Sequence, residues 1–220
     1  MRTKRAGPIR KLLLDGEFVA IHDRQQPIVF FQHSRWGSED RAPVYGEFLA
    51  PLEGSECDRA GRPKDAIWVQ DGLVAMPLRY VQLLLHDPLS ISSGAVPGFD
   101  PQEDIDVRIP NPASYILQKA LVLEKRPPLK QRKDLAYVFE TAALWYEQGE
   151  CIRSMVDSIS SQSPEWARWV ERGERILFDG FETAESDGAV SAELDFGSPV
   201  RAATVSLLTT RFLEAVFTPR

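Results

Sequence analysis

Six basic side chains lie close together in the middle of this chain, within fifteen positions of one another. They are Lys119, Lys125, Arg126, Lys130, Arg132 and Lys133. Ammonium and guanidinium groups bind phosphate oxygens, so a cluster of this kind can neutralise a polyphosphate such as that of a nucleotide. The first chemistry that the sequence suggests is therefore local anion binding.

Helical spacing brings several of these cations together. On a helix that begins near Ala113, Lys119 and Arg126 are seven residues apart and share a face. The Pro127-Pro128 pair ends that helix, and the next begins near Gln131. Lys130, Lys133 and Asp134 then lie at the start of the second helix, close to Arg126, where backbone N–H groups can also hold an anion. The alternative is a solvated turn in which Asp134 only favours the positive end of its helix.

A second candidate site has acidic side chains. In the segment Asp104-Ile105-Asp106, the spacing puts both carboxylates on one face of the strand that leads to Ile109. Two carboxylates on one face can hold a divalent cation. The alternative is that these acids, which follow a Pro/Gly-rich loop, are solvated.

The elements that position these residues change in type along the chain. Apolar alternation and turn residues predict strands in the first half; they are Phe18–Ile21, Ile28–Phe31, Val44–Leu49, Ile67–Val69, Leu73–Ala75 and Ile105–Ile109. Asp23 to Gln26 is the expected turn of the first hairpin, and Asp71-Gly72 that of another. A short helix is expected from Leu78 to Leu85, followed by a loop from Ser90 to Gln102.

After Pro112 the apolar spacing is helical. It predicts four helices, at 113–125, 131–148, 164–178 or somewhat further, and 200–217, with a break from Asp187 to Pro199. Strands followed by helices indicate an α+β fold, with a mixed β-sheet and then a C-terminal helical region. We expect two regions, 1–110 and 111–220.

Bulk composition narrows the class of protein. The formal net charge of -6 argues against a protein that coats nucleic acid through its overall field. The two cysteines, Cys57 and Cys151, form neither a metal motif nor a disulfide framework, which indicates a reducing compartment. No apolar run near the N-terminus is long enough for a signal peptide or a membrane span, so we expect a cytoplasmic protein without membrane contact.

The order of several short motifs resembles a known family. The helical segment after the catalytic region of AbiEii-type and related nucleotidyltransferase-like proteins, in the DNA polymerase β superfamily, is similar to this part of the chain. The matching residues are Pro112, Ala113, Lys119, Arg126, Lys130, Lys133 and Asp134. Upstream, the segment 45–52 is similar to a strand near their site, and 76–80 to the helix start that follows. The resemblance covers roughly residues 10 to 150.

The resemblance implies a fold, a cofactor and further site residues. In such proteins a Gly-Ser turn holds the phosphates, and an Asp-x-Asp pair binds Mg²⁺ for in-line nucleotidyl transfer. That pair should lie before residue 10, yet Met1 to Arg10 contains no Asp or Glu. By its place in the resemblance, Glu47 is the expected third carboxylate of the catalytic site.

Two functions follow from these features. In the first, an enzyme transfers a nucleoside monophosphate to a protein or RNA acceptor. Its metal ligands either precede Met1 or are reassembled from Glu47, Asp104 and Asp106, and Asp134 orients a lysine or contacts the metal. In the second, a module of the same fold binds a nucleotide, RNA or a partner protein in a basic cleft without chemistry. In both, the triphosphate is neutralised by Lys119, Arg126, Lys130 and Lys133. Some relatives belong to toxin–antitoxin pairs; the sequence does not indicate the oligomeric state.

Overall fold

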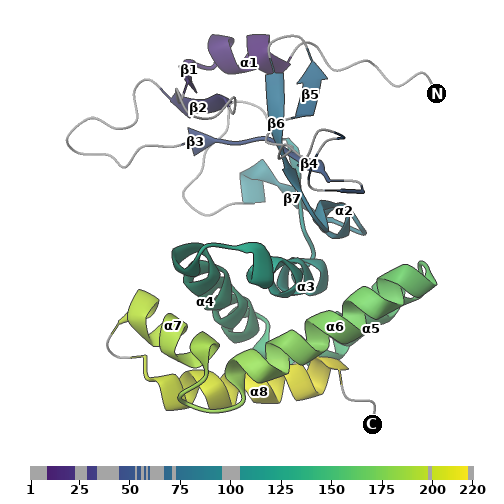
Figure 1. Ribbon diagram of the computed structural model, residues 1–220, viewed down its shortest axis with the longest axis vertical. Helices are drawn as coiled ribbons and strands as arrows, with labels where there is room; N and C mark the ends of the chain where they lie inside the picture. The colour runs from purple at the N-terminus through teal and green to yellow at the C-terminus, as the bar shows by residue number, and fades with distance from the viewer. Residues whose placement is uncertain are drawn as a thin grey trace. The chain divides into compact units, whose positions relative to one another are not determined.

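The computed structural model describes most of the chain. The described residues are 9–22, 29–33, 45–52, 54–55, 57, 59, 67–70, 73–95, 105–197 and 200–217. The chain forms two compact units, Met1–Val81 and Gln82–Arg220, each of which has its own packing. Strands dominate the first unit and helices the second (Figure 1).

The first unit begins with a helix and an antiparallel hairpin. Helix α1 (Ile9–Asp15) leads into strand β1 (Phe18–His22), which pairs with β2 (Val29–His33). This confirms the predicted strand pair, while its expected turn, Asp23 to Gln26, lies outside the described residues. The short strand β3 (Tyr45–Gly46) pairs with β2 on the other side.

A second sheet of this unit is mixed. Strand β6 (Leu73–Leu78) lies between β4 (Leu49–Pro51), to which it is parallel, and β5 (Ile67–Gln70), to which it is antiparallel. The prediction of one strand at Val44–Leu49 was wrong, because two short strands, β3 and β4, lie there and pair with different strands. Tyr45 pairs with β2, whereas the carbonyl of Phe48 already accepts from the N–H of Met76 on β6.

Apolar packing centres on the start of β6. Leu73 is fully buried. Four side chains pack against it: Ile9 and Leu13 of α1, Phe18 of β1, and Phe48, which precedes β4. Burying one such leucine contributes about 2 kcal/mol relative to leaving it exposed. This cluster therefore ties α1 and β1 to the mixed sheet.

The helix expected from Leu78 is shorter than predicted. Leu78 is still the last residue of β6, and α2 spans only Val81–Leu84. Tyr80 has a φ of 61°, which is outside the right-handed helical region, so a helix cannot begin before it. The apolar spacing that looked helical therefore belongs partly to a strand end.

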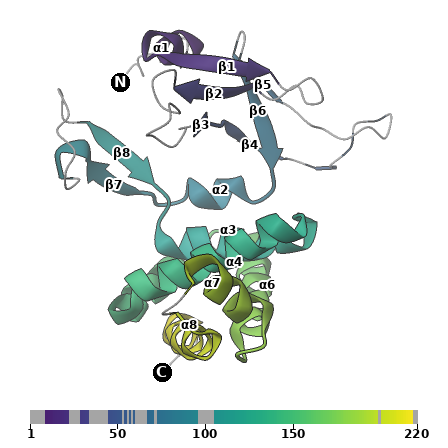
Figure 2. The ribbon, with the colours of Figure 1, turned by 90° about the vertical axis from the view of Figure 1, so that its left-hand side faces the viewer.

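A two-stranded ribbon follows α2. Strand β7 (Leu89–Ser92) pairs antiparallel with β8 (Asp106–Ile109), as Figure 2 shows. The strand predicted at Ile105–Ile109 is confirmed, but the loop predicted from Ser90 was wrong in its first part. Ser90 and Ser92 suggested a loop, whereas both residues belong to the strand that pairs with β8.

Six α-helices complete the described part of the second unit. They are α3 (Pro112–Val122), α4 (Pro128–Leu144), α5 (Gly149–Ser160), α6 (Pro164–Phe181), α7 (Asp187–Phe196) and α8 (Ala202–Phe217). The four predicted helices are present, although α4 begins earlier, at Pro128. Helix α5 was missed, and the break predicted from Asp187 was wrong, because small buried side chains let α7 pack closely against α4.

The helices share one core. Helix α3 packs on α6, α5 on α8, and α7 on both α4 and α8. The largest fully buried side chains of this unit include Ile116, Leu117, Leu121, Ile152, Ile159, Leu177, Phe181, Phe212 and Leu213. Each comes from an amphipathic helix whose polar face is exposed.

Asn111 joins the ribbon segment to the first long helix. Its side-chain oxygen accepts from the N–H of Ser114 at 2.8 Å, and its amide donates to the carbonyls of His86 and Asp87 at 2.9 and 3.1 Å. Asn111 is 1% exposed. The side chain thus caps α3 and fixes the end of the turn after α2 at the same time.

We expect Asn111→Ala to lower the free energy of unfolding by about 2 kcal/mol, because a cap and two buried acceptors lose their partner together. Asn111→Asp keeps the acceptor for Ser114 but turns a buried carboxylate oxygen toward the carbonyls of His86 and Asp87, so its cost should be larger still. Urea unfolding of the three proteins measures this order. Equal stability of Asn111→Ala and the unaltered chain would contradict it.

The architecture is α+β, as predicted, with a mixed sheet in the first unit and helices through most of the second. Within the described residues, no helix combines the length and the apolar character that a membrane span requires.

Candidate functional site

The site forms at the turn between α3 and α4. Helix α3 ends in a 3₁₀ turn, Leu123–Lys125, and Arg126 then adopts an extended conformation with φ -92° and ψ 143°. A residue before proline is disfavoured in the helical region, so Pro127 forces this change. Pro128 then starts α4, where its missing N–H costs nothing.

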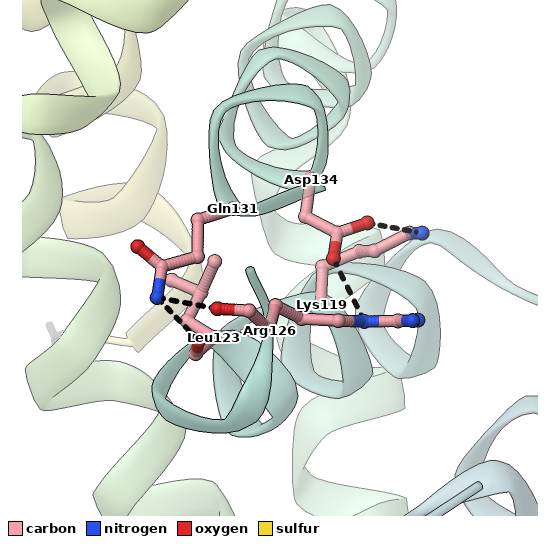
Figure 3. A network of polar contacts seen from close by, with 5 residues as sticks. All are labelled: Lys119, Leu123, Arg126, Gln131 and Asp134. Atoms are coloured by element: carbon pink, nitrogen blue, oxygen red, sulfur yellow. Dashed lines mark hydrogen bonds and ion pairs between the residues drawn. The ribbon is translucent and has the colours of Figure 1, made fainter. Parts of the chain in front are cut away.

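Three charged side chains meet at this turn. Lys119 Nζ donates to Asp134 Oδ1 at 2.7 Å, and Arg126 Nε lies 3.4 Å from Asp134 Oδ2 (Figure 3). The side chains of Lys119, Arg126 and Asp134 are 15%, 20% and 8% exposed. We call these three residues the Lys119–Asp134–Arg126 cluster. One carboxylate is shared by two cations, so the cluster carries a net positive charge in a largely buried position.

Gln131 fixes the backbone of the turn. Its amide nitrogen donates to the carbonyls of Leu123 and Arg126 at 3.0 and 2.9 Å, as Figure 3 also shows. The carbonyl of Leu123 also accepts from the N–H of Arg126 at 2.9 Å, which closes the 3₁₀ turn. The position of Arg126 is therefore set by the first turns of α4.

Two tyrosines surround the lysine. Lys119 Nζ lies 5.3 Å from the ring centroid of Tyr115 and 5.3 Å from that of Tyr137, and Lys133 Nζ lies 5.6 Å from the Tyr137 ring. Each distance is within the range of a cation–π contact. Burial, and then the neighbouring Tyr137, Asp134 and Glu140, raise the pKa of Tyr115 to about 12. The Tyr115 hydroxyl therefore stays protonated at neutral pH.

The surrounding charge is also positive. Lys130 and Lys133 lie exposed on the first two turns of α4, and the first turn of this helix contains no acidic residue. Cations are normally disfavoured at a helix N-terminus because the helix dipole is positive there. An anion bound at this turn would relieve that repulsion and would contact the Lys119–Asp134–Arg126 cluster.

The predicted metal ligands are arranged differently. Glu47 is exposed in the first unit, Asp106 is exposed on β8 in the second, and Asp104 lies outside the described residues. Among the residues that the structure describes, no three His, Cys, Asp or Glu side chains are grouped to hold a metal ion. Asp134 does not fit that role either, because a divalent cation there would meet Lys119 and Arg126. The described residues thus do not fit a Mg²⁺ site.

The structure brings Lys119, Arg126 and Asp134 of the predicted residues into contact, and Lys133 lies over the same Tyr137 ring as Lys119. Sequence reasoning missed the neighbours of these charged residues. Tyr115, Tyr137 and Gln131 were not predicted. The spacings Tyr115 to Lys119 and Lys133 to Tyr137 are four residues, so each pair shares a helix face, and this signal could have identified the tyrosines.

Comparison with known proteins identifies the family of the chain. The family model described as nucleotidyltransferase matches residues 18–151, which is more than half of the chain and contains the whole Lys119–Asp134–Arg126 cluster. The chain therefore belongs to the nucleotidyltransferase family. No curated protein and no solved structure matched it.

Proposed function

We propose that this protein binds the triphosphate of a nucleoside triphosphate at the turn between α3 and α4. The observation that carries the proposal is the sharing of Asp134 by Lys119 and Arg126. A largely buried cluster with more cations than anions gains from a bound anion, because Coulomb interactions are stronger there than in water. Lys130 and Lys133 extend the positive surface toward solvent and suit the outer phosphates.

Membership of the family supports a further step, transfer of the nucleoside monophosphate to an acceptor on RNA or protein. Such transfer depends on positioning the triphosphate and on neutralising the charge that develops on its phosphates. Lys119 and Arg126 would supply the neutralisation, and Asp134 would hold them in place. The divalent cation, expected to be Mg²⁺, would need carboxylates outside this cluster, with Asp104, Asp106 and Glu47 as the predicted ones.

Direct binding of nucleoside triphosphates tests the proposal. We expect Lys119→Ala combined with Lys133→Ala to weaken binding by about 100-fold, since charged hydrogen bonds contribute more than neutral ones. Binding should also weaken steeply as salt is added. Titration calorimetry with ATP and GTP at several salt concentrations measures both effects.

Arg175→Ala combined with Arg211→Ala is the matched control, because it removes two exposed positive charges, from α6 and α8, and leaves the turn intact. Its affinity for triphosphates should equal that of the unaltered chain. Equal losses in the control and in the variant with Lys119→Ala and Lys133→Ala would show that only the total charge matters, and would overturn the site.

The second candidate function is binding without transfer. It is favoured by the absence of a three-carboxylate group among the described residues. Incubation with a labelled triphosphate, Mg²⁺ and either cellular RNA or protein separates the two functions. Label that appears on an acceptor only with Mg²⁺ supports transfer, whereas tight binding that needs no metal and gives no labelled acceptor supports the binding module.

The likeness to AbiEii-type proteins extends the same proposal to a toxin–antitoxin role. Such a role predicts that expression of this chain arrests growth of its host, and that Lys119→Ala relieves the arrest. Growth curves with the two proteins expressed at equal levels provide the test.

A further inference from the structure

The β7–β8 ribbon has one apolar and one polar face. Leu89 and Ile91 pair with Ile109 and Val107, and these four side chains lie on the same face. The other face carries two serines of β7 and the charged pair of β8, Asp106 and Arg108. All four residues of β8 are exposed, including Val107 at 44% and Ile109 at 37%.

One backbone edge of strand β8 pairs with no other strand among the described residues. The N–H of Ser93 donates to the carbonyl of Ile105 at 2.8 Å, and antiparallel pairs alternate between hydrogen-bonded and non-hydrogen-bonded. The polar backbone groups of Ile105, Val107 and Ile109 therefore point toward β7, and those of Asp106 and Arg108 point away from it. Within the described part of the chain, β8 pairs with β7 alone. Neither the Asp106 side chain nor the Arg108 side chain forms a hydrogen bond or an ion pair there.

We propose that β8 pairs with β8 of a second copy of this chain, antiparallel, across a two-fold axis at Val107. In this register Asp106 lies opposite Arg108 of the partner subunit, and the same pair repeats on the other side of the axis. The outward backbone N–H and C=O groups of Asp106 then form hydrogen bonds with those of Arg108 of the partner subunit. Two ribbons then form one four-stranded sheet.

Charge selects this register among its neighbours. Shifting the axis to Asp106 puts two carboxylates opposite each other, and shifting it to Arg108 puts two guanidinium groups opposite each other. The second shift also pairs Asp106 with Pro110 of the partner subunit, which has no N–H to donate. Only the axis at Val107 combines opposite charges with a full set of backbone donors.

The charge pattern also indicates a second copy as the occupant. Exposed strand edges are commonly protected by charges of one sign, which repel another edge. Here the signs are opposite and two residues apart, so the edge is complementary to itself. On the apolar face, the same register places Ile105 beside Ile109 of the partner subunit and the two Val107 side chains side by side, where cross-strand contacts add stability.

Sedimentation velocity of the full chain over a wide concentration range tests the pairing. We expect a dimer that dissociates on dilution. Asp106→Arg and Arg108→Asp should each raise the dissociation constant at least about ten-fold, because every substitution acts twice in a two-fold interface. Arg211→Asp, with the same change of charge on an exposed residue of α8, should leave it unchanged.

A mixture of the two single variants gives the most specific test of the register. The Asp106→Arg and Arg108→Asp proteins each repel their own kind, but an equimolar mixture should associate as tightly as the unaltered chain, because opposite charges then face each other. The double variant that carries both substitutions should also recover the dimer. Far-UV circular dichroism confirms that every variant is folded. A monomer at all concentrations, or a dimer that neither single substitution weakens, would overturn the proposal.

Discussion

Replacing Asp134 by asparagine should lower the free energy of unfolding by about 3 kcal/mol. The shape of the side chain is retained, but Lys119 and Arg126, both largely buried, lose the only carboxylate within ion-pair distance among the described residues. Removing one partner of a buried ion pair is costly, because the remaining charge has been taken out of water without compensation. Urea unfolding followed by circular dichroism measures the loss.

A neutral replacement of the whole cluster separates stability from function. Combining Lys119→Met and Arg126→Met with Asp134→Leu leaves no unpaired charge, and it should recover most of the lost stability, since well-packed apolar side chains often replace buried ion pairs at little cost. The same protein should bind triphosphates poorly. If Asp134→Asn is as stable as the unaltered chain, the cluster is more solvated than its burial indicates and the argument for a retained anion site is weakened.

The second large effect concerns the junction of α6, α7 and α8. Phe181, the last residue of α6, is fully buried, and its carbonyl accepts from Ser206 Oγ at 2.8 Å and from Thr210 Oγ1 at 3.1 Å. We expect Phe181→Ala to cost about 4 kcal/mol, through lost burial and the cavity that remains. Phe181→Leu should cost roughly 1.5 kcal/mol, because a leucine fills most of the space.

Gly188 on α7 lies against the same ring. A Cβ added at Gly188 would lie 2.6 Å from Phe181 Cζ and would also clash with the carbonyl oxygen of Gly180. Gly188→Ala should therefore cost about 2 kcal/mol through overpacking. Combined with Phe181→Leu, the added methyl gains room, so the double variant should be more stable than the sum of the two costs predicts. Strict additivity in thermal unfolding would show that the clash is with the backbone alone.

The sequence predicted the parts of the fold where local pattern and tertiary packing agree. Pro127 and Pro128 separate two helices with clear apolar stripes, so the helix pair and the position of its cations followed from spacing alone. The direct contact of Lys119 with Asp134 did not follow, because it depends on how far α4 is rotated about its own axis. That rotation is fixed by the core and by Gln131, neither of which has a local signature.

The missed elements have compositions typical of loops. Helix α7 contains Gly188, Ala189, Ser191 and Ala192 on its buried face, and the glycine and the serine are typical of a turn when they are read locally. In the folded chain these small side chains allow close approach to neighbouring helices, and burial outweighs the weak helix propensity of Gly188 and Ser191. In the same way, Ser90 and Ser92 concealed β7, whose pairing partner lies more than a dozen residues further along the chain.

The glutamine at the turn has a consequence for how a ligand would arrive. Gln131 donates to the carbonyls of Leu123 and Arg126 in the protein without ligand, so the turn that we propose as the phosphate site is already ordered before a ligand binds. Binding then orders little of the chain. The loss of conformational entropy that would accompany the ordering of a flexible loop occurs during folding and does not weaken binding. Capture of a nucleotide at such a preorganised turn should be governed by electrostatic attraction and diffusion rather than by loop closure.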